Sequence, residues 1–231
     1  MLGFDPLYFI VVGPALLLSL WAQVKVQSTF KRFSQVATNS GLSGAEAAGR
    51  ILQAFGAQQV EVQRTQGFLS DHYDPRKRVL RLSPPVFGGR SISSIGVAAH
   101  EAGHALQHAQ GYFPLKIRTA LVPITQLGSW LAWPLLLIGL MMSAAALIKL
   151  GILFFSGAVL FQLVTLPVEF DASKRAVAIL GNQGILSGTE LDGTRKVLSA
   201  AALTYVAGAA AAVLQLVYFL LRAGMLGGRD E

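Results

Sequence analysis

Four long apolar stretches constrain the fold of this chain more strongly than any other feature of its sequence. They cover residues 7–26, 130–148, 151–168 and about 200–221. A helix of about 20 residues is roughly 30 Å long, which matches the hydrocarbon layer of a membrane. Backbone surrounded by lipid must satisfy its own hydrogen bonds, and a helix does so within one segment. We therefore expect four transmembrane helices.

The composition supports this interpretation. Hydrophobic residues make up 53% of the chain and charged residues 13%, against roughly 25% charged residues in a soluble domain. The chain has no cysteine, which excludes disulfides and cysteine-ligated metals. The net charge of +7 is not accompanied by a nucleic-acid-binding module, so we expect membrane lipid as a partner and no nucleic acid.

The basic residues predict the topology. Asp5 precedes the first stretch and no Lys or Arg does, so we interpret that stretch as a retained helix rather than a signal peptide. Only Lys149 and Leu150 separate the second and third stretches, which predicts a tight hairpin returning the chain to the same side. Of the 19 Lys and Arg residues, 16 flank this hairpin in polar segments, and the others are Lys149, Arg222 and Arg229. By the positive-inside rule the polar segments face the cytoplasm and both termini lie outside.

The polar segment between the first and second apolar stretches contains signals for short helices and strands. Ser43 and Glu46 form a capping-box pattern, which predicts a helix over residues 45–55. The alternating residues 60–63 and 79–82 read as two strands of a small sheet. Asp71-His-Tyr-Asp-Pro75 reads as a turn between them.

Ser91 to Gln110 is predicted to be a helix, and it carries His100-Glu-Ala-Gly-His104. Residues four apart share a helix face, so both imidazoles converge on one metal ion. A zinc ion lowers the pKa of a bound water to about 7. Glu101 is placed to take the proton of that water and pass it to a leaving amine. These polar groups stand in a small, apolar run, where they would be costly to bury without such a role.

A third metal ligand must come from elsewhere. His108 lies about 12 Å from His100 along a straight helix, too far to share one ion, and is interpreted as a polar helix-end residue. The metzincin pattern is rejected because positions 107 and 110 are both Gln. Glu169 directly follows the hairpin, where Pro167 is expected to start a new helix. Asp171, on roughly the opposite helix face, is the rival ligand.

Several blocks of this sequence resemble the YugP-type neutral zinc metallopeptidases of bacterial membranes. The similarity extends over essentially the whole chain, including the layout of four spans. The blocks are Asp71-His-Tyr-Asp-Pro75, Leu80-Arg-Leu-Ser83, Val97-Ala-Ala-His-Glu-Ala-Gly-His-Ala-Leu-Gln107 and Leu166-Pro-Val-Glu-Phe-Asp-Ala-Ser173. The resemblance implies one zinc ion held by His100, His104 and Glu169, with Glu101 catalytic, in a multi-pass protein of the bacterial cell membrane.

The chain is more distantly similar to the CAAX prenyl protease and HtpX-type membrane metalloproteases. Their third-ligand segment reads Glu-x-x-Ala-Asp, and that Asp orients a histidine ligand. Here the segment is Glu169-Phe-Asp-Ala-Ser173, so the resemblance leaves the orienting role open. Ser173 stands at the position of the Asp, and Asp171 or a backbone carbonyl is the alternative.

Two further roles have candidates in the sequence. An oxyanion forming in the reaction needs a donor, for which the candidates are His72, Tyr73, Arg175 and Tyr205. A peptide substrate pairs with an exposed strand edge. We expect that edge on the strand that precedes the His helix, formed by Val79, Leu80, Arg81 and Leu82.

The sequence thus predicts a mainly helical integral membrane protein with a small α+β, zincin-like catalytic region. The function that we expect is a zinc endopeptidase acting on membrane or membrane-proximal proteins. The alternatives are a non-catalytic membrane scaffold tied by zinc, and a zinc hydrolase of a non-peptide amide or ester. The expected parts are an N-terminal transmembrane helix (residues 1–26), a cytoplasmic catalytic region (27–118) and a transmembrane hairpin (119–168). They are followed by a helical segment with the third ligand (169–199) and a C-terminal transmembrane helix with its tail (200–231).

Overall fold

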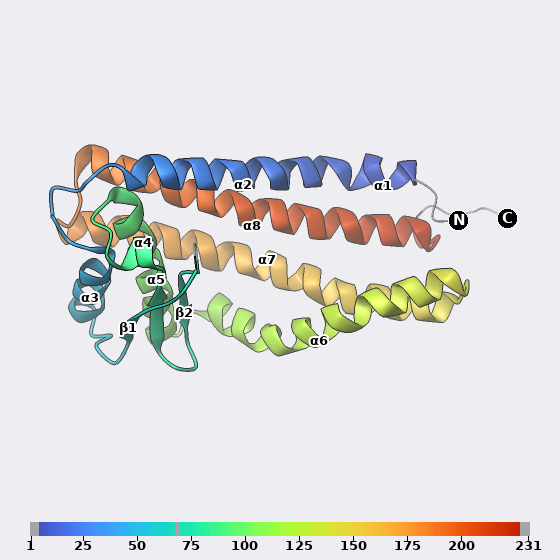
Figure 1. Cartoon of the computed structure of the whole chain (residues 1–231). Helices are drawn as coiled ribbons and strands as arrows, with labels where there is room; N and C mark the ends of the chain where they lie inside the picture. Colours follow the sequence, from blue (N-terminus) through green and yellow to red (C-terminus); the bar gives the residue numbers. More distant parts are fainter. Residues whose placement is uncertain (1–4, 68–69, 227–231) are drawn as a thin grey trace. The chain divides into compact units, whose positions relative to one another are not determined.

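The computed structural model describes residues 5–67 and 70–226, and the chain divides into two compact units. Of the described residues, unit 1 comprises 5–22, 117–166 and 204–226, and unit 2 comprises 23–67, 70–116 and 167–203. Each passage of the chain between the units falls inside a long helix. These helices are α2 (Gly13–Ser34), α6 (Phe113–Met141), α7 (Ala145–Asn182) and α8 (Gly188–Arg222), all visible in Figure 1.

In unit 1, α6 and α7 form a hairpin that turns at residues 142–144 (Figure 1). The turn was expected at Lys149 and Leu150, and that prediction is wrong because both residues lie inside α7. Lys and Leu favour helix, whereas Ser143 adopts a left-handed conformation with φ 52° and reverses the chain. Gly151 brings the two helices close, since a Cβ there would lie 2.7 Å from Leu136 Cγ.

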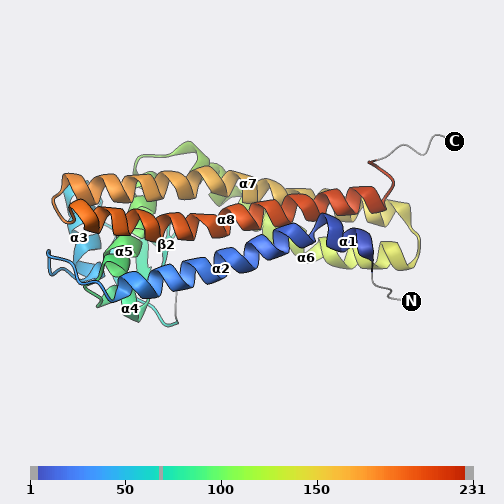
Figure 2. The same ribbon diagram turned by 90° about the horizontal axis from the view of Figure 1, so that it is seen from above.

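Within the described residues, three helices are long and apolar enough to cross a membrane, namely α6, α7 and α8. The first apolar stretch of the sequence is divided between α1 (Pro6–Val11) and α2, and it does not meet the same criterion. In unit 1, α1 packs on the end of α8, where the Tyr218 hydroxyl donates to Asp5 at 2.8 Å. The rings of Tyr8 and Tyr218 meet edge to face at 5.1 Å, and Figures 1 and 2 show the two helices side by side.

Two helices of unit 2, Gly44–Ala54 and Ile92–Ala109, begin within one residue of the predicted starts. α3 (Gly44–Ala54) has the full capping box, in which Ser43 Oγ accepts from the Glu46 backbone and Glu46 accepts from the Ser43 backbone. α4 (Pro84–Phe87) is a single turn. α5 (Ile92–Ala109) starts at the N-cap Ser91 and ends before Gly111, whose φ of 66° suits glycine.

The sheet of unit 2 has three strands, β1 (Glu61–Arg64), β2 (His72–Asp74) and β3 (Val79–Leu82), in the order β1-β3-β2. β3 pairs parallel with β1 and antiparallel with β2. The segment expected as a turn is therefore a strand, and the chain reverses after it, at residues 75–78. Asp71 holds this arrangement together, because its carboxylate accepts from the Ser83 backbone at 2.7 Å and from the Ser83 hydroxyl.

Two further predictions are wrong. β3 lies in the centre of the sheet with both edges paired, so its residues Val79, Leu80, Arg81 and Leu82 have no edge for a substrate strand. Pro167 does not start a helix, because α7 runs without a break from Ala145 to Asn182. A proline inside a helix removes one backbone hydrogen bond, which the packing of neighbouring helices offsets.

Candidate metal centre

Three potential ligands converge in unit 2, where α5 lies against α7. His100 Nε2 lies 3.2 Å and His104 Nε2 3.5 Å from the same carboxylate oxygen of Glu169, Oε2. All three ligand atoms lie within 4.8 Å of one another. A tetrahedral zinc ion with bonds of about 2.1 Å separates its ligand atoms by roughly 3.4 Å. The spacing of the two nitrogens from the carboxylate oxygen therefore fits a zinc ion.

A glycine allows the two helices to come this close. A Cβ on Gly103 of α5 would lie 2.9 Å from the backbone oxygen of Ala172 on α7. Only a residue without a side chain lets these backbones approach without a shift. Gly103 precedes His104, and Ala172 is three residues beyond Glu169. The close contact therefore lies beside the ligands that it brings together.

The centre is buried and favours a cation. Glu169 is 1% exposed and His104 6%. Burial alone would lower the pKa of His104, but the hydrogen bond and charge of Glu169, with the charge of Glu101, raise that pKa above its usual value. The same negative field that attracts a proton to this imidazole attracts a metal ion.

Each histidine is supported by a different side chain. His104 Nδ1 lies 3.0 Å from the side-chain oxygen of Gln107, whose amide nitrogen donates to the Val168 carbonyl and to Asp171. His100 Nδ1 lies 3.1 Å from the Ser173 hydroxyl. Ser173, one of the candidates for orienting a histidine ligand, thus contacts His100 directly. Asp171 lies outside the ligand cluster and reaches His104 only through Gln107.

Gln107 was not among the predicted site residues. The sequence does contain a signal for it, because a residue three positions after His104 lies on the same helix face. A glutamine near a helix end is usually a solvated residue. Gln107 is instead completely buried, which only its partners on α7 explain.

Glu101 occupies a distinct position in the centre. It follows His100 on α5 and is 8% exposed. Among the described residues, its carboxylate has no hydrogen-bond or ion-pair partner. Buried carboxylates are normally paired with a hydrogen-bond donor or a cation. Glu101 is an exception, so its carboxylate does not stabilise the fold through such a pair.

The remaining predicted residues lie at varied places. The Tyr73 hydroxyl on β2 contacts His108 Nδ1 at 2.8 Å, one helical turn beyond His104. His72 contacts the Ser70 carbonyl and Arg81. Arg175 donates to Asp171 and to Gln110. Tyr205 belongs to unit 1, so its predicted role in the centre stays a prediction.

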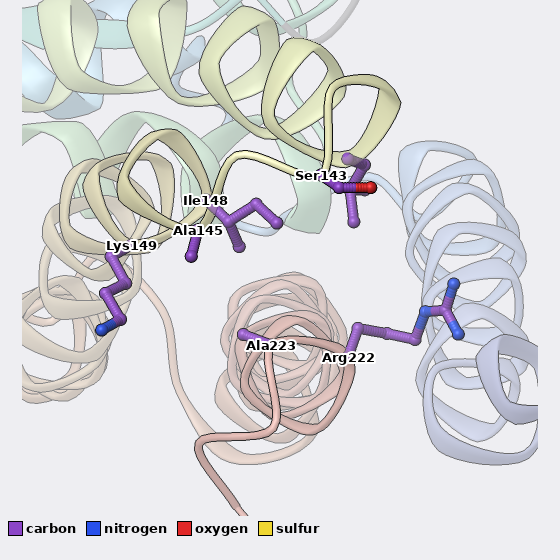
Figure 3. Close-up of a pocket in the computed structure, with 7 residues that line it drawn as sticks. Ser143, Ala145, Ile148, Lys149, Arg222 and Ala223 are labelled. Atoms are coloured by element: carbon purple, nitrogen blue, oxygen red, sulfur yellow. The ribbon is translucent and has the colours of Figure 1, made fainter.

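A separate hollow of about 250 Å³ lies in unit 1, between the α6–α7 turn and the end of α8 (Figure 3). Its two charged side chains, Lys149 and Arg222, point in opposite directions. No His, Asp or Glu lines it. The hollow therefore has none of the ligand chemistry of the cluster in unit 2.

Two histidines four residues apart on one helix, a glutamate from a second helix and a glutamate next to the first histidine are the ligand and base set of zinc metallopeptidases. The chain belongs to the family described as "Putative neutral zinc metallopeptidase", whose model matches residues 8–224. It is 49% identical to the "Putative membrane protease YugP" of Bacillus subtilis (strain 168) over 225 residues, 97% of this chain and 99% of that protein. The resemblance to the YugP-type family inferred from the sequence is thereby confirmed. No solved structure matches the chain.

Proposed function

We propose that the chain is a zinc-dependent endopeptidase of the bacterial cell membrane that cleaves membrane or membrane-proximal proteins. The observation that carries this proposal is the convergence of His100, His104 and Glu169 beside the unpaired Glu101. The printed names of the family and of its Bacillus relative support the same activity.

His100, His104 and Glu169 would hold the ion, and Glu101 would handle the proton. When bound, zinc supplies a Lewis acid and an acidified water molecule. The Glu101 carboxylate accepts a proton as a peptide carbonyl is attacked, and donates it to the leaving amine. Its lack of a structural partner leaves it available for both steps.

A peptide substrate would lie along β2. The outer edge of this strand has no strand partner in the part of the sheet that the structure describes. Tyr73 joins β2 to α5 next to the turn that carries His104. An extended peptide paired with this edge would gain main-chain hydrogen bonds, and Tyr73 or His72 would lie beside it as oxyanion donors.

The membrane topology is part of the proposal. α6 and α7 would cross as a hairpin, and the excess of Lys and Arg around it supports a cytoplasmic location of the metal centre. A fourth crossing by α1 and α2 is supported by contacts at both ends of α8. Asp5 meets Tyr218 in unit 1, and Gly193 faces Phe33 in unit 2. Both termini would then lie outside; Arg229 is beyond the described residues.

The three-ligand count favours catalysis over a scaffold. A structural zinc site is closed by four protein ligands, whereas a catalytic site keeps one position open. The cluster found among residues 5–67 and 70–226 has three members. A hydrolase of a non-peptide amide or ester would need the same centre, and a panel of peptide, amide and ester substrates separates the two activities.

The decisive experiment compares Glu101→Gln with the wild type. We expect both to bind about one zinc ion per chain, and the variant to cleave a membrane-protein substrate at least about 100-fold more slowly, the usual contribution of a general base. Glu61→Gln makes the same change at an exposed position of β1 and should cleave normally. Undiminished cleavage by Glu101→Gln, or a zinc-free wild type, would contradict the proposal.

A further inference from the structure

We propose that Gln107 is a positioning residue that fixes which nitrogen of His104 faces the metal. The proposal rests on the proposed function, because it assumes that His100, His104 and Glu169 bind zinc. It assigns a role to a side chain that is completely buried and that contacts neither the metal position nor the substrate edge.

The hydrogen bonds of Gln107 determine its orientation. Its amide nitrogen donates to the Val168 carbonyl at 2.9 Å and to the Asp171 carboxylate at 2.7 Å. Both partners are acceptors only, so they use both amide hydrogens. The amide oxygen must then be the atom that lies 3.0 Å from His104 Nδ1.

That orientation determines the tautomer of His104. An amide oxygen accepts and cannot donate, so His104 Nδ1 must carry the hydrogen. In a neutral imidazole the other nitrogen is then unprotonated. His104 Nε2, 3.5 Å from Glu169 Oε2, therefore presents its lone pair to the metal position.

The same amide links the two ligand-bearing helices. Its acceptors on α7 flank Glu169, since Val168 precedes this residue and Asp171 follows it by two positions. Asp171 is held in turn by Arg175, which also donates to Gln110 on the end of α5. A shift of α7 along α5 would break these hydrogen bonds and would also separate Glu169 from the two histidines.

His100 lacks an equivalent support. Its Nδ1 contacts the Ser173 hydroxyl, which rotates and can either donate or accept. Ser173 therefore does not select a tautomer. We therefore expect Gln107 to have a larger effect on metal binding than Ser173.

The test measures zinc affinity of the full-length protein in detergent, by competition with a chromophoric chelator. Loss of a side chain that orients a metal-ligating histidine typically costs 10–100-fold in metal affinity, and we expect a loss in this range for Gln107→Leu. Ser173→Ala should lose less. Asp171→Asn keeps an acceptor for the amide, so it should lose less zinc affinity than Gln107→Leu. The visible spectrum of the Co²⁺-substituted protein should change in Gln107→Leu, because the coordination of the metal by His104 changes.

Thr194→Val is the matched control, because Thr194 is a buried polar residue of the same unit without a contact to the centre. It should bind zinc as the wild type does. Wild-type affinity and an unchanged Co²⁺ spectrum in Gln107→Leu would overturn the proposal. Failure of the wild type to bind zinc would instead refute the proposed function.

A second measurement needs no variant that might misfold. The chain has four histidines, so nitrogen-15 NMR of the zinc-loaded wild type with labelled histidine resolves each ring. We expect His104 with the hydrogen on Nδ1. A hydrogen on Nε2 of His104 would overturn the proposal even if Gln107→Leu failed to fold.

Discussion

The helix α7 packs against α6 in unit 1 and against α5 in unit 2. Each contact contains a glycine, Gly151 or Gly103, and the two differ in the atom that lies nearest to that glycine. In unit 1, the nearest atom to a Cβ built on Gly151 belongs to the side chain of Leu136. In unit 2, the nearest atom to a Cβ on Gly103 is the backbone oxygen of Ala172. A side chain can change rotamer, whereas a helical backbone cannot move alone. At Gly151 the closest atom can move by rotation of the Leu136 side chain, and the backbone nitrogen of Leu136 lies further away, at 3.1 Å. The contact at Gly103 is made by backbone first, and it fixes the spacing of metal ligands.

The surroundings of α7 differ in the same way. Its unit 1 part exposes Leu153, Leu160 and Leu163, a surface suited to lipid. Its unit 2 part buries the carboxylate of Glu169. One continuous helix thus supplies packing at one end and chemistry at the other. Changes at the two ends should therefore separate stability from metal binding.

The largest expected effect is that of Glu169→Gln. The amide has no negative charge to attract a cation, so zinc affinity should fall by more than about 100-fold, beyond the range for supporting residues. Zinc per chain after dialysis measures this loss, and helix content by circular dichroism should be unchanged. If Glu169→Gln kept its zinc while Asp171→Asn lost it, the rival ligand Asp171 would be reinstated.

A smaller effect is expected for Gly103→Ala. The added methyl group meets the Ala172 backbone, and overpacking of this kind costs about 1–3 kcal/mol. Because the strain separates α5 from α7, zinc affinity should fall by about tenfold, equivalent to about 1.4 kcal/mol. Gly49→Ala, in α3 of the same unit with open space around it, should stabilise the protein by up to about 1 kcal/mol. Equal zinc affinities of the two variants would show that the contact of Gly103 with Ala172 does not fix the spacing of the metal ligands.

The smallest effect on the centre is expected for Gly151→Ala. The methyl group meets the Leu136 side chain, so melting in detergent should occur at a lower temperature, with a cost of about 1 kcal/mol at the low end for overpacking. Zinc affinity should be unchanged. Gly157→Ala, on the same helix with nothing within 4 Å, should melt at the wild-type temperature or above it. A drop in zinc affinity of Gly151→Ala would show that the two ends of α7 are not separable.

Local signals predicted the parts of the structure that depend on neighbours in sequence. The caps at Ser43 and Ser91 and the spacing of His100 and His104 fall within one or two turns of helix, and the structure has them as expected. β2 was missed because Asp71 and Pro75 are typical turn residues, while its strand character comes from pairing with β3. The position of the hairpin turn was missed because the polar Lys149 suggested a break that helix propensity did not require.

The site was predicted in the same uneven way. The sequence indicated Glu169 through its place after the hairpin, together with the family resemblance. Gln107 lies on the same helix face as His104, but nothing local distinguishes a buried glutamine from a solvated one. Its partners Val168 and Asp171 lie more than 60 residues away, and only the packing of α5 on α7 brings them within reach.

The separation of the ligands along the chain has a consequence for biosynthesis. His100 and His104 are made before the hairpin, and Glu169 is made after it. A nascent chain that ends within α6 carries two of the three ligands and none of the bonds that orient Gln107. The proposed peptidase activity therefore starts only after both hairpin helices have been synthesised, which spares the ribosome-bound intermediate and its neighbours from premature cleavage.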